Sequence, residues 1–203
     1  MQIKAFVVMN NYNNDTSWIK EYTDNYIIYN KGEPIDDPKA IQTPNVGYNI
    51  YDYLTYTIDN YDNLPDCVMF IKSNIFPRHM TKEEFDEVCE RTEFTPLLSK
   101  THKTYMPTCF YDENGVFNEK NDSWYIHEYP SKFFNAYYEF AEEMGLPSQS
   151  YIPFAPGANY TVPKANIHKH SKEYYAKLRT YVDYTQLPGE AHIIERALYS
   201  IWR

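Results

Sequence analysis

Two apolar runs of the kind that form fully buried strands lie on either side of one helical pattern. The runs 3–9 and 67–71 contain almost no polar residues, which is typical of strands covered on both faces of a parallel sheet. Between them, apolar side chains recur at the spacing of one helical face: Ile50, Tyr53, Leu54, Ile58 and Tyr61. This order of strand, helix and strand predicts an α/β fold with helices on the faces of the sheet.

The rest of the chain continues the succession of short elements. We expect further strands at 26–29, 151–154 and 159–162, loops at 33–44 and 72–80, and a hairpin turn at Asn114-Gly115. Helices are expected after Thr81, where Glu84 completes a capping box, from Ser131 to Gly145, after Ser171 and after Pro188. No repeat or linker interrupts 1–203, so the sequence predicts one domain with a mixed, mainly parallel sheet. Trp202-Arg203 ends the chain inside a helical pattern, which suits either this domain alone or a domain cut from a longer protein.

Charge, hydropathy and cysteine usage exclude several classes of protein. The net charge of -9 argues against nucleic acid as a partner, because phosphate backbones select basic faces. No apolar run approaches the roughly 20 residues that cross a bilayer, and the N-terminus lacks the pattern of a signal peptide. The three cysteines are far apart and form no CxxC pair, which argues against a zinc site or a disulfide framework. Together these features predict a cytoplasmic protein.

Two candidate site segments directly follow the two apolar runs. The handedness of α/β crossovers places both at the carboxyl edge of the sheet, where ligands bind. In the first segment Asn11, Tyr12 and Asp15 suit contact with a nucleotide, although such a segment is also typical of a solvated loop. The second segment offers a set of groups that suit a diphosphate or a metal ion: Lys72, Asn74, Arg78 and His79. A basic surface turn explains this second segment equally well.

A third candidate segment lies on the last expected helix. His192, Glu195 and Tyr199 share one helical face, and Glu190 precedes them. Glu195 suits either a salt bridge with Arg196 or the role of general base in a pocket. The chain has no Gly-rich phosphate loop, GxSxG elbow or HExxH motif, which excludes the commonest P-loop, serine-hydrolase and zinc-protease classes.

The order of short motifs along the chain resembles that of a known group of proteins. The motifs are Val7-Val8, Tyr12-Asn13-Asn14-Asp15, Ser17-Trp18, Ile28-Tyr29-Asn30-Lys31-Gly32, Asn45-Val46-Gly47, Tyr53-Leu54, the stretch 60–66, the stretch 70–79, Gly157-Ala158-Asn159-Tyr160-Thr161-Val162 and Glu195-Arg196. They resemble the GT-A nucleotide-sugar transferases and, among these, a poorly characterised glycosyltransferase-like family. The resemblance spans most of the chain in one order, although each motif alone is weak.

The resemblance implies a single GT-A-like, Rossmann-like domain that transfers a sugar from a nucleotide-sugar donor, with UDP as the expected nucleotide, to a glycan or glycoprotein acceptor. It implies that Asn11, Tyr12 and Asp15 contact the base or ribose near Lys31, and that Lys72, Asn74, Arg78 and His79 handle the diphosphate. The acceptor side is expected at Gly157, Asn159, Tyr160 and His192. Glu195 or Glu190 is the expected catalytic base.

The chain departs from this group at the position of its metal ligands. Many GT-A enzymes carry an Asp-x-Asp where this chain has Lys72-Ser73-Asn74. Either Asn74 and His79 hold a divalent cation (Mn²⁺ or Mg²⁺), or Lys72 and Arg78 neutralise the diphosphate without metal. The departure also suits a catalytically inert module of the same fold that binds a nucleotide or a glycan.

Tyrosine is unusually abundant, with 22 residues. A viral or AT-rich microbial genome explains this through codon bias, and would place a viral protein in the host cytoplasm. Tyrosine also suits stacking on sugars, and a Tyr-rich surface leaves a third function open, that of an interaction protein.

Overall fold

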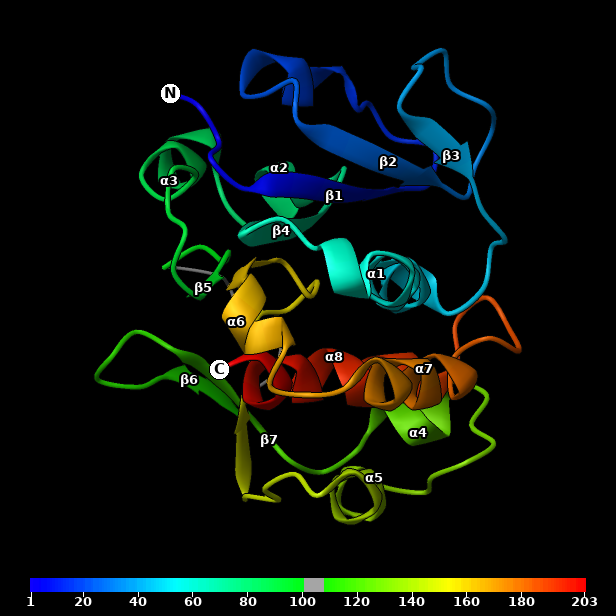
Figure 1. Cartoon of the computed structure of the whole chain (residues 1–203). Coiled ribbons are helices and arrows are strands. Elements are labelled where there is room, and N and C mark those ends of the chain that lie inside the picture. The colour runs from blue at the N-terminus through cyan, green and yellow to red at the C-terminus, as the bar shows by residue number, and fades with distance from the viewer. Residues whose placement is uncertain (101–107) are drawn as a thin grey trace.

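The computed structural model describes residues 1–100 and 108–203, which form an α/β domain around a six-stranded sheet (Figure 1). The order of the strands is β3-β2-β1-β4-β9-β5. Their bounds are Phe6–Asn11 for β1, Tyr26–Asn30 for β2, Ala40–Gln42 for β3, Cys67–Lys72 for β4, Thr95–Pro96 for β5 and Tyr160–Pro163 for β9. Strands β3, β2, β1 and β4 are parallel, and β9 is antiparallel to both β4 and β5. The predicted fold, a mixed and mainly parallel sheet flanked by helices, is confirmed.

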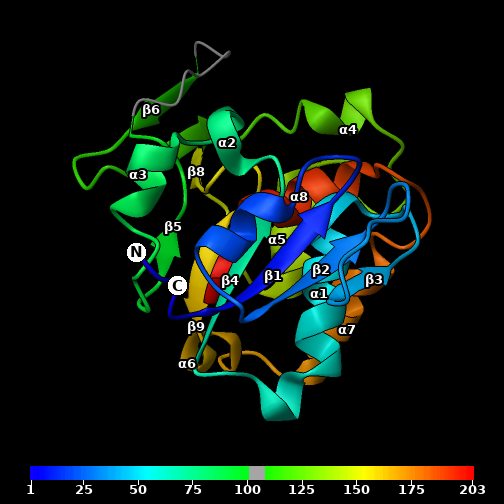
Figure 2. The same cartoon turned by 90° about the horizontal axis from the view of Figure 1, so that it is seen from above.

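Alternate residues of β1 face two separate cores, which explains why its sequence is apolar almost throughout. Val7 and Met9 pack on one side with Ile19, which belongs to the 3-10 helix η1 (Ser17–Glu21). Val8 packs on the other side against the helices α1 (Tyr48–Asp59), α7 (Lys172–Thr180) and α8 (Gly189–Trp202). Figure 2, seen from above, shows η1 crossing in front of β1 while α1 and α8 lie behind the sheet.

A small antiparallel sheet lies on the far side of α8 from the large sheet (Figure 1). It consists of β6 (Cys109–Tyr111), β7 (Phe117–Lys120) and β8 (Tyr151–Pro153). The expected hairpin turn at Asn114-Gly115 is confirmed between β6 and β7, where Asp112 accepts hydrogen bonds from the backbone N–H groups of Asn114 and Val116. Gly115 has a φ of 73°, a conformation that suits glycine.

The remaining helices are short. They are η2 (Tyr61–Asn63), α2 (Ile75–Arg78), α3 (Lys82–Asp86), α4 (Tyr125–Glu128), α5 (Tyr137–Met144) and α6 (Lys164–Ile167). The capping box at Thr81 and the cap at Ser171 are confirmed by their hydrogen bonds. In the described ranges, no helix combines the length and the apolar composition that a bilayer crossing requires.

Three expected boundaries were wrong. The segment 33–44 contains β3, a three-residue edge strand that pairs with β2 and is too short to show periodicity. The segment 72–80 contains the single turn of α2, and β4 extends through Lys72. The helix expected from Ser131 starts only at Tyr137, because the backbone N–H groups of Lys132 and Phe133 donate to the Glu190 carboxylate instead of forming a helical turn.

Candidate functional site

The direction in which strands are added to the large sheet reverses between β1 and β4. From β1 the chain adds β2 and β3 on one side and then crosses to place β4 on the other. Open α/β sheets bind ligands at such a switch point, outside the carboxyl ends of the strands. The register pairs Asn10 with Lys72 at this edge, so the expected meeting of the two loops is confirmed.

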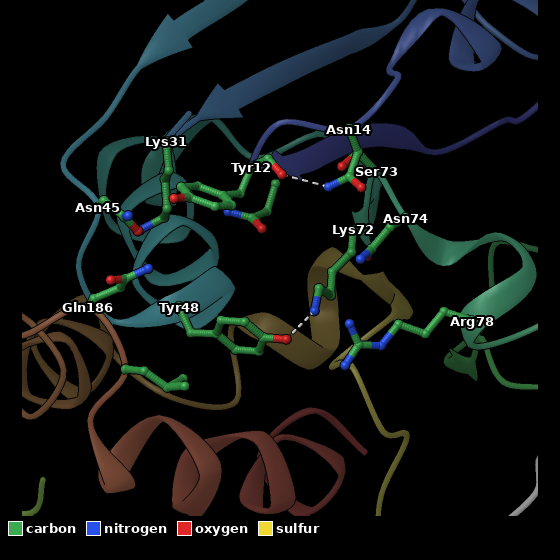
Figure 3. A pocket seen from close by; sticks show the side chains of 12 residues that line it. Tyr12, Asn14, Lys31, Asn45, Tyr48, Lys72, Ser73, Asn74, Arg78 and Gln186 are labelled. Atoms are coloured by element: carbon green, nitrogen blue, oxygen red, sulfur yellow. Dashed lines mark hydrogen bonds between the residues drawn. The ribbon is translucent and has the colours of Figure 1, made fainter. Parts of the chain in front are cut away.

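A pocket of about 230 Å³ opens at this switch point (Figure 3). The loops after β1 and β4, the start of α1 and the loop before α8 all contribute to its wall. The lining residues are Asn10, Tyr12, Asn14, Lys31, Asn45, Tyr48, Lys72, Ser73, Asn74, Arg78, Gln186 and Leu187.

One end of the pocket is cationic. The side chains of Lys72 and Arg78 point toward the hydroxyl of Tyr48 (Figure 3). Lys72 is only 5% exposed, and its ammonium donates a hydrogen bond to the Tyr48 hydroxyl and lies 4.1 Å from the centroid of that ring. Within the described ranges, neither Lys72 nor Arg78 forms an ion pair. Burial and the neighbouring Arg78 guanidinium lower the pKa of Lys72 to about 8, although the Glu195 charge opposes this.

The opposite end of the pocket holds a second lysine whose charge is compensated. The Lys31 ammonium lies 3.4 Å from a carboxylate oxygen of Asp52 and donates to the carbonyls of Pro44 and Val46. Asp52, which is fully buried on α1, also accepts hydrogen bonds from Asn10 and from a threonine hydroxyl. Burial raises the pKa of Asp52 to about 7, and burial lowers that of Lys31.

Sequence reasoning missed Asp52, although one signal was available. Asp52 lies on α1 directly before Tyr53 and Leu54, which are buried and apolar. An acidic side chain in such a position needs a buried partner. That partner is Lys31, the first residue after the end of β2.

The floor of the pocket depends on an unusual start of α1. Gly47 and Tyr48 both have positive φ angles, 61° and 54°, which is uncommon for a bulky residue such as tyrosine. Their backbone N–H groups donate to the carbonyls of Thr185 and Gln186. A Cβ at position 47 would lie 2.5 Å from a backbone oxygen, so the close approach requires glycine. This pairing holds Tyr48 and the loop before α8 at one site.

Of the residues expected to contact a nucleotide, two line the pocket and two do not. Tyr12 and Lys31 line it, and Tyr12 is 49% exposed. Asn11 is fully buried, where its amide donates to the Asn30 side chain. Asp15 accepts a hydrogen bond from the backbone of the residue two positions later, which lowers the pKa of this carboxyl.

Three of the four residues expected to handle a diphosphate line the pocket, namely Lys72, Asn74 and Arg78. The fourth, His79, is buried beside Gly157: a Cβ at position 157 would lie 2.6 Å from its imidazole. Asn74 stands at the start of α2 and His79 at its end, so the short helix separates the two residues expected to hold a metal ion.

The residues expected on the acceptor side support the pocket from behind. The Asn159 side chain accepts a hydrogen bond of 2.9 Å from the backbone N–H of Lys72, and the Gly157 N–H donates to Glu195. Tyr160 is fully buried in the core, where its hydroxyl accepts from the N–H of Ala155. None of these residues lies among the described residues that line the pocket.

His192 of α8 is surrounded by aromatic side chains from the segment around α4. Its ring stacks on Tyr129 at 4.5 Å and is tilted against Tyr125 and Trp124, while its Nδ1 is 3.5 Å from the Glu195 carboxylate. The Nε2 atom is buried and has no hydrogen-bond partner within the described ranges.

The two candidate bases have different surroundings. Glu190 accepts hydrogen bonds from the backbone of Lys132 and Phe133 and from the Tyr184 hydroxyl, and so anchors the loop before α5. Glu195 accepts from the Gly157 N–H at 2.6 Å and from Arg196. Although burial favours the neutral acid, these contacts and the neighbouring His192 lower the pKa of Glu195 to about 2. A carboxylate with this pKa is a weak proton acceptor at neutral pH.

The three candidate segments converge to different extents. The loops after β1 and β4 share the pocket, whereas the described lining holds no residue of the third segment and only Gln186 and Leu187 from the loop before it. Glu195 itself lies outside the described pocket wall, but its charge acts on Lys72 and Tyr48. The arrangement suits a ligand with concentrated negative charge at one end and groups that accept hydrogen bonds at the other.

The cysteines and the acidic residues give no separate site in the described part of the chain. All three cysteines are free. In the ranges 1–100 and 108–203, no three His, Cys, Asp or Glu side chains lie together as they would to hold a metal ion.

Comparison with models of known protein families gives a match that covers almost the whole chain. No curated protein and no solved structure matches this chain. Residues 6–203 match the family described as a protein of unknown function, DUF3431. Since this match spans both loops of the pocket and the last helix, the chain belongs to the DUF3431 family.

Proposed function

We propose that the pocket binds the nucleoside diphosphate of a nucleotide sugar, UDP being the first nucleotide to test, and that the protein transfers the sugar to a glycan or glycoprotein acceptor. The observation that carries this proposal is the Lys72 ammonium, which is buried, forms no ion pair in the described part of the chain and stands beside Arg78. The position of the pocket, at the switch point of the sheet, supports it.

A buried ammonium without a counterion destabilises the empty protein, because the charge loses its hydration and gains no partner. A second cation at the same place adds repulsion. A diphosphate would supply negative charge to both groups. The planar guanidinium of Arg78 matches two phosphate oxygens, while Lys72 acts as a point charge. The two side chains come from the end of β4 and from α2 and point into the same space (Figure 3).

The rest of the pocket suits the nucleoside. Tyr12, half exposed at the mouth of the pocket, offers a ring on which a base or ribose stacks. The side-chain amides of Asn45 and Gln186 lie toward the Lys31 end, away from Arg78 (Figure 3). Amides donate and accept hydrogen bonds, as the polar edge of a base requires.

Transfer of a sugar from a nucleoside diphosphate depends mainly on stabilising the charge of the leaving group. Lys72 and Arg78 are the groups that would do so. Glu195 is the candidate base for the acceptor hydroxyl, since its charge reaches the cationic end of the pocket. His192 and Gly157, which both contact Glu195, would then lie on the acceptor side.

One observation favours a second function, a catalytically inert module that binds a nucleotide or a glycan. The oxygens of Glu195 are engaged by Gly157, Arg196 and His192, and its pKa is lowered to about 2. A group held in this way is poorly suited to accept a proton. The inert module would use the same pocket and the same two cations.

Thermal unfolding in the presence of nucleoside diphosphates tests the binding step. UDP is expected to raise the Tm, and above its Kd the rise grows with the logarithm of ligand concentration, because UDP binds only the native state. Arg78→Met is expected to reduce the shift, whereas Lys82→Met, which removes an exposed lysine paired with Glu21, should leave it unchanged. The absence of any shift with millimolar nucleoside diphosphates would refute the proposal. Release of UDP from donor sugars, with and without glycan acceptors, separates the enzyme from the inert module.

A further inference from the structure

We infer that Lys72 and Arg78 neutralise the diphosphate directly and that nucleotide binding at this pocket requires no divalent cation. This inference rests on the proposed function and states how the same pocket handles its charge. Two independent observations support it: the kind of atoms that line the pocket, and the position of the two cations within it.

The atoms that line the pocket fit a divalent cation poorly. Mg²⁺ and Mn²⁺ prefer carboxylate oxygens as ligands. The described lining residues are amides, hydroxyls, cations and one leucine, with no Asp or Glu among them. The two buried carboxylates beside the pocket are already engaged, Asp52 by Lys31 and Asn10 and Glu195 by the Gly157 N–H and Arg196. Lys72, the last residue of β4, stands where the resemblance to GT-A transferases leads us to expect an acidic ligand.

Asn74 and His79, the two residues expected to hold a metal ion, do not share the pocket. Asn74 lines it, and its Oδ1 atom is buried and forms no hydrogen bond within the described ranges. His79 lies at the other end of α2, with its imidazole against the backbone of Gly157. One amide oxygen is a weak site for a hard cation, because such ions are usually held by several oxygens, including carboxylates.

The charge already present in the pocket acts against a bound metal ion. Lys72 and Arg78 point into the same space from two elements (Figure 3), and their mutual repulsion adds to burial in lowering the pKa of Lys72. A divalent cation beside them would add repulsion that no described lining carboxylate offsets. The same two groups are the natural counterions of a diphosphate, which then needs no bridging metal.

Calorimetric titration of UDP in excess EDTA and in excess Mn²⁺ tests the inference. The two Kd values are expected to agree within about threefold, a difference of less than 1 kcal/mol. Arg78→Met should weaken binding at least about tenfold in EDTA, as expected for the loss of a charge-assisted contact. Arg78 is exposed, so its replacement leaves the fold intact. Lys82→Met, at an exposed ion pair, is the matched control and should bind as the parent protein does.

The possible results separate this inference from the proposed function. Binding in Mn²⁺ that is lost or weakened at least about tenfold in EDTA would overturn the inference and leave the proposed function standing. Binding in neither condition would overturn both. Equal binding in both conditions that is unaffected by Arg78→Met would overturn the assignment of the two cations.

Proton uptake on binding gives a second test of direct contact between Lys72 and the diphosphate. If a metal ion contacted the diphosphate in place of Lys72, this uptake would not occur. The groups that act on Lys72 are Arg78 from α2, Glu195 from α8 and the Tyr48 hydroxyl from α1. A diphosphate in contact with Lys72 raises its pKa from about 8, so binding near pH 8 takes up part of a proton. Titrations in buffers of different ionisation enthalpy are expected to show this uptake in the parent protein and to lose it in Lys72→Met. Binding without proton uptake at pH 8 would contradict direct contact with Lys72.

Discussion

Replacing Lys72 by methionine is expected to make the empty protein more stable while abolishing nucleotide binding. Lys72 is 5% exposed, forms no ion pair in the described part of the chain and has the Tyr48 hydroxyl as its hydrogen-bond partner. Methionine is similar in length, unbranched and uncharged, so it fills the same space beside the Tyr48 ring without a desolvated charge. Most substitutions at buried positions destabilise a protein, and a stabilising one here would identify a residue retained for binding.

The pKa of Lys72 gives the size of the expected effect. The pKa falls from 10.5 to about 8 on folding, so the folded state holds the Lys72 proton less tightly than the unfolded chain does. At about 1.4 kcal/mol for each tenfold change, the charged form costs roughly 3 kcal/mol of folding free energy. We expect Lys72→Met to raise the free energy of unfolding at pH 7 by about 1–3 kcal/mol, since some of this cost is recovered by relaxation around the side chain.

The sign of the pH dependence follows from the same values. Because the folded pKa is depressed, the cost is fully present below about pH 8 and disappears as the pH rises toward 10.5. The advantage of Lys72→Met over the parent protein should therefore shrink between pH 8 and 10. Urea denaturation at pH 7, 8.5 and 10, followed by circular dichroism, measures it.

Lys31→Met is a matched control, for which we expect a change in the free energy of unfolding of the opposite sign. Lys31 is equally buried and lines the same pocket, but its ammonium contacts the Asp52 carboxylate and two backbone carbonyls. Lys31→Met leaves Asp52 without its cation and should destabilise the protein by roughly 3 kcal/mol. If Lys72→Met lowers the free energy of unfolding at pH 7 as much as Lys31→Met does, the argument from the unpaired charge is refuted.

Three further substitutions follow, two at supports behind the pocket and one outside its wall. Gly157→Ala should destabilise the protein by roughly 2 kcal/mol or more in urea denaturation, because φ is 90° and the new Cβ would lie 2.6 Å from the His79 ring. Glu195→Gln should lower the free energy of unfolding at pH 7 by roughly 3 kcal/mol, because the pKa of Glu195 is depressed to about 2 in the folded protein. This difference should vanish between pH 4.5 and pH 2, since the stabilising contribution of Glu195 is lost as its carboxylate is protonated. Thr81→Ala, which breaks a capping box outside the described pocket wall, should cost about 1 kcal/mol in urea denaturation and leave the UDP shift unchanged.

Much of the large sheet could be predicted from sequence because buried parallel strands leave a strong signal. The run that became β4 is buried at every position, so nearly all of its residues are apolar. The opposite holds for β3, where Ile41 is 46% exposed and three residues at an edge carry no periodicity. The late start of α5 also left no local signal, since Glu190, more than fifty residues away, engages the preceding backbone.

The pocket was predictable in position but not in its full composition. The carboxyl edge of β1 and β4 follows from topology, which brought Tyr12, Lys72 and Arg78 together as expected. Tyr48 was not foreseen, because its role depends on two successive residues with positive φ and on pairing with a loop 138 residues later. Contacts of this kind arise from tertiary structure, which no local pattern encodes.

The pocket lysines and Glu195 together explain how a protein with a net charge of -9 keeps a site for an anion. Lys31 is neutralised by Asp52, and the charge of Glu195 is held by Arg196, which in turn contacts Glu119 at 2.6 Å. Glu195 therefore lowers the cost of the charge on Lys72 only in part, as the pKa of about 8 shows. The two remaining cations, Lys72 and Arg78, form a small positive region on a negatively charged molecule. Such a distribution favours a compact ligand with concentrated negative charge and disfavours an extended polyanion, which the net negative charge of the molecule would repel.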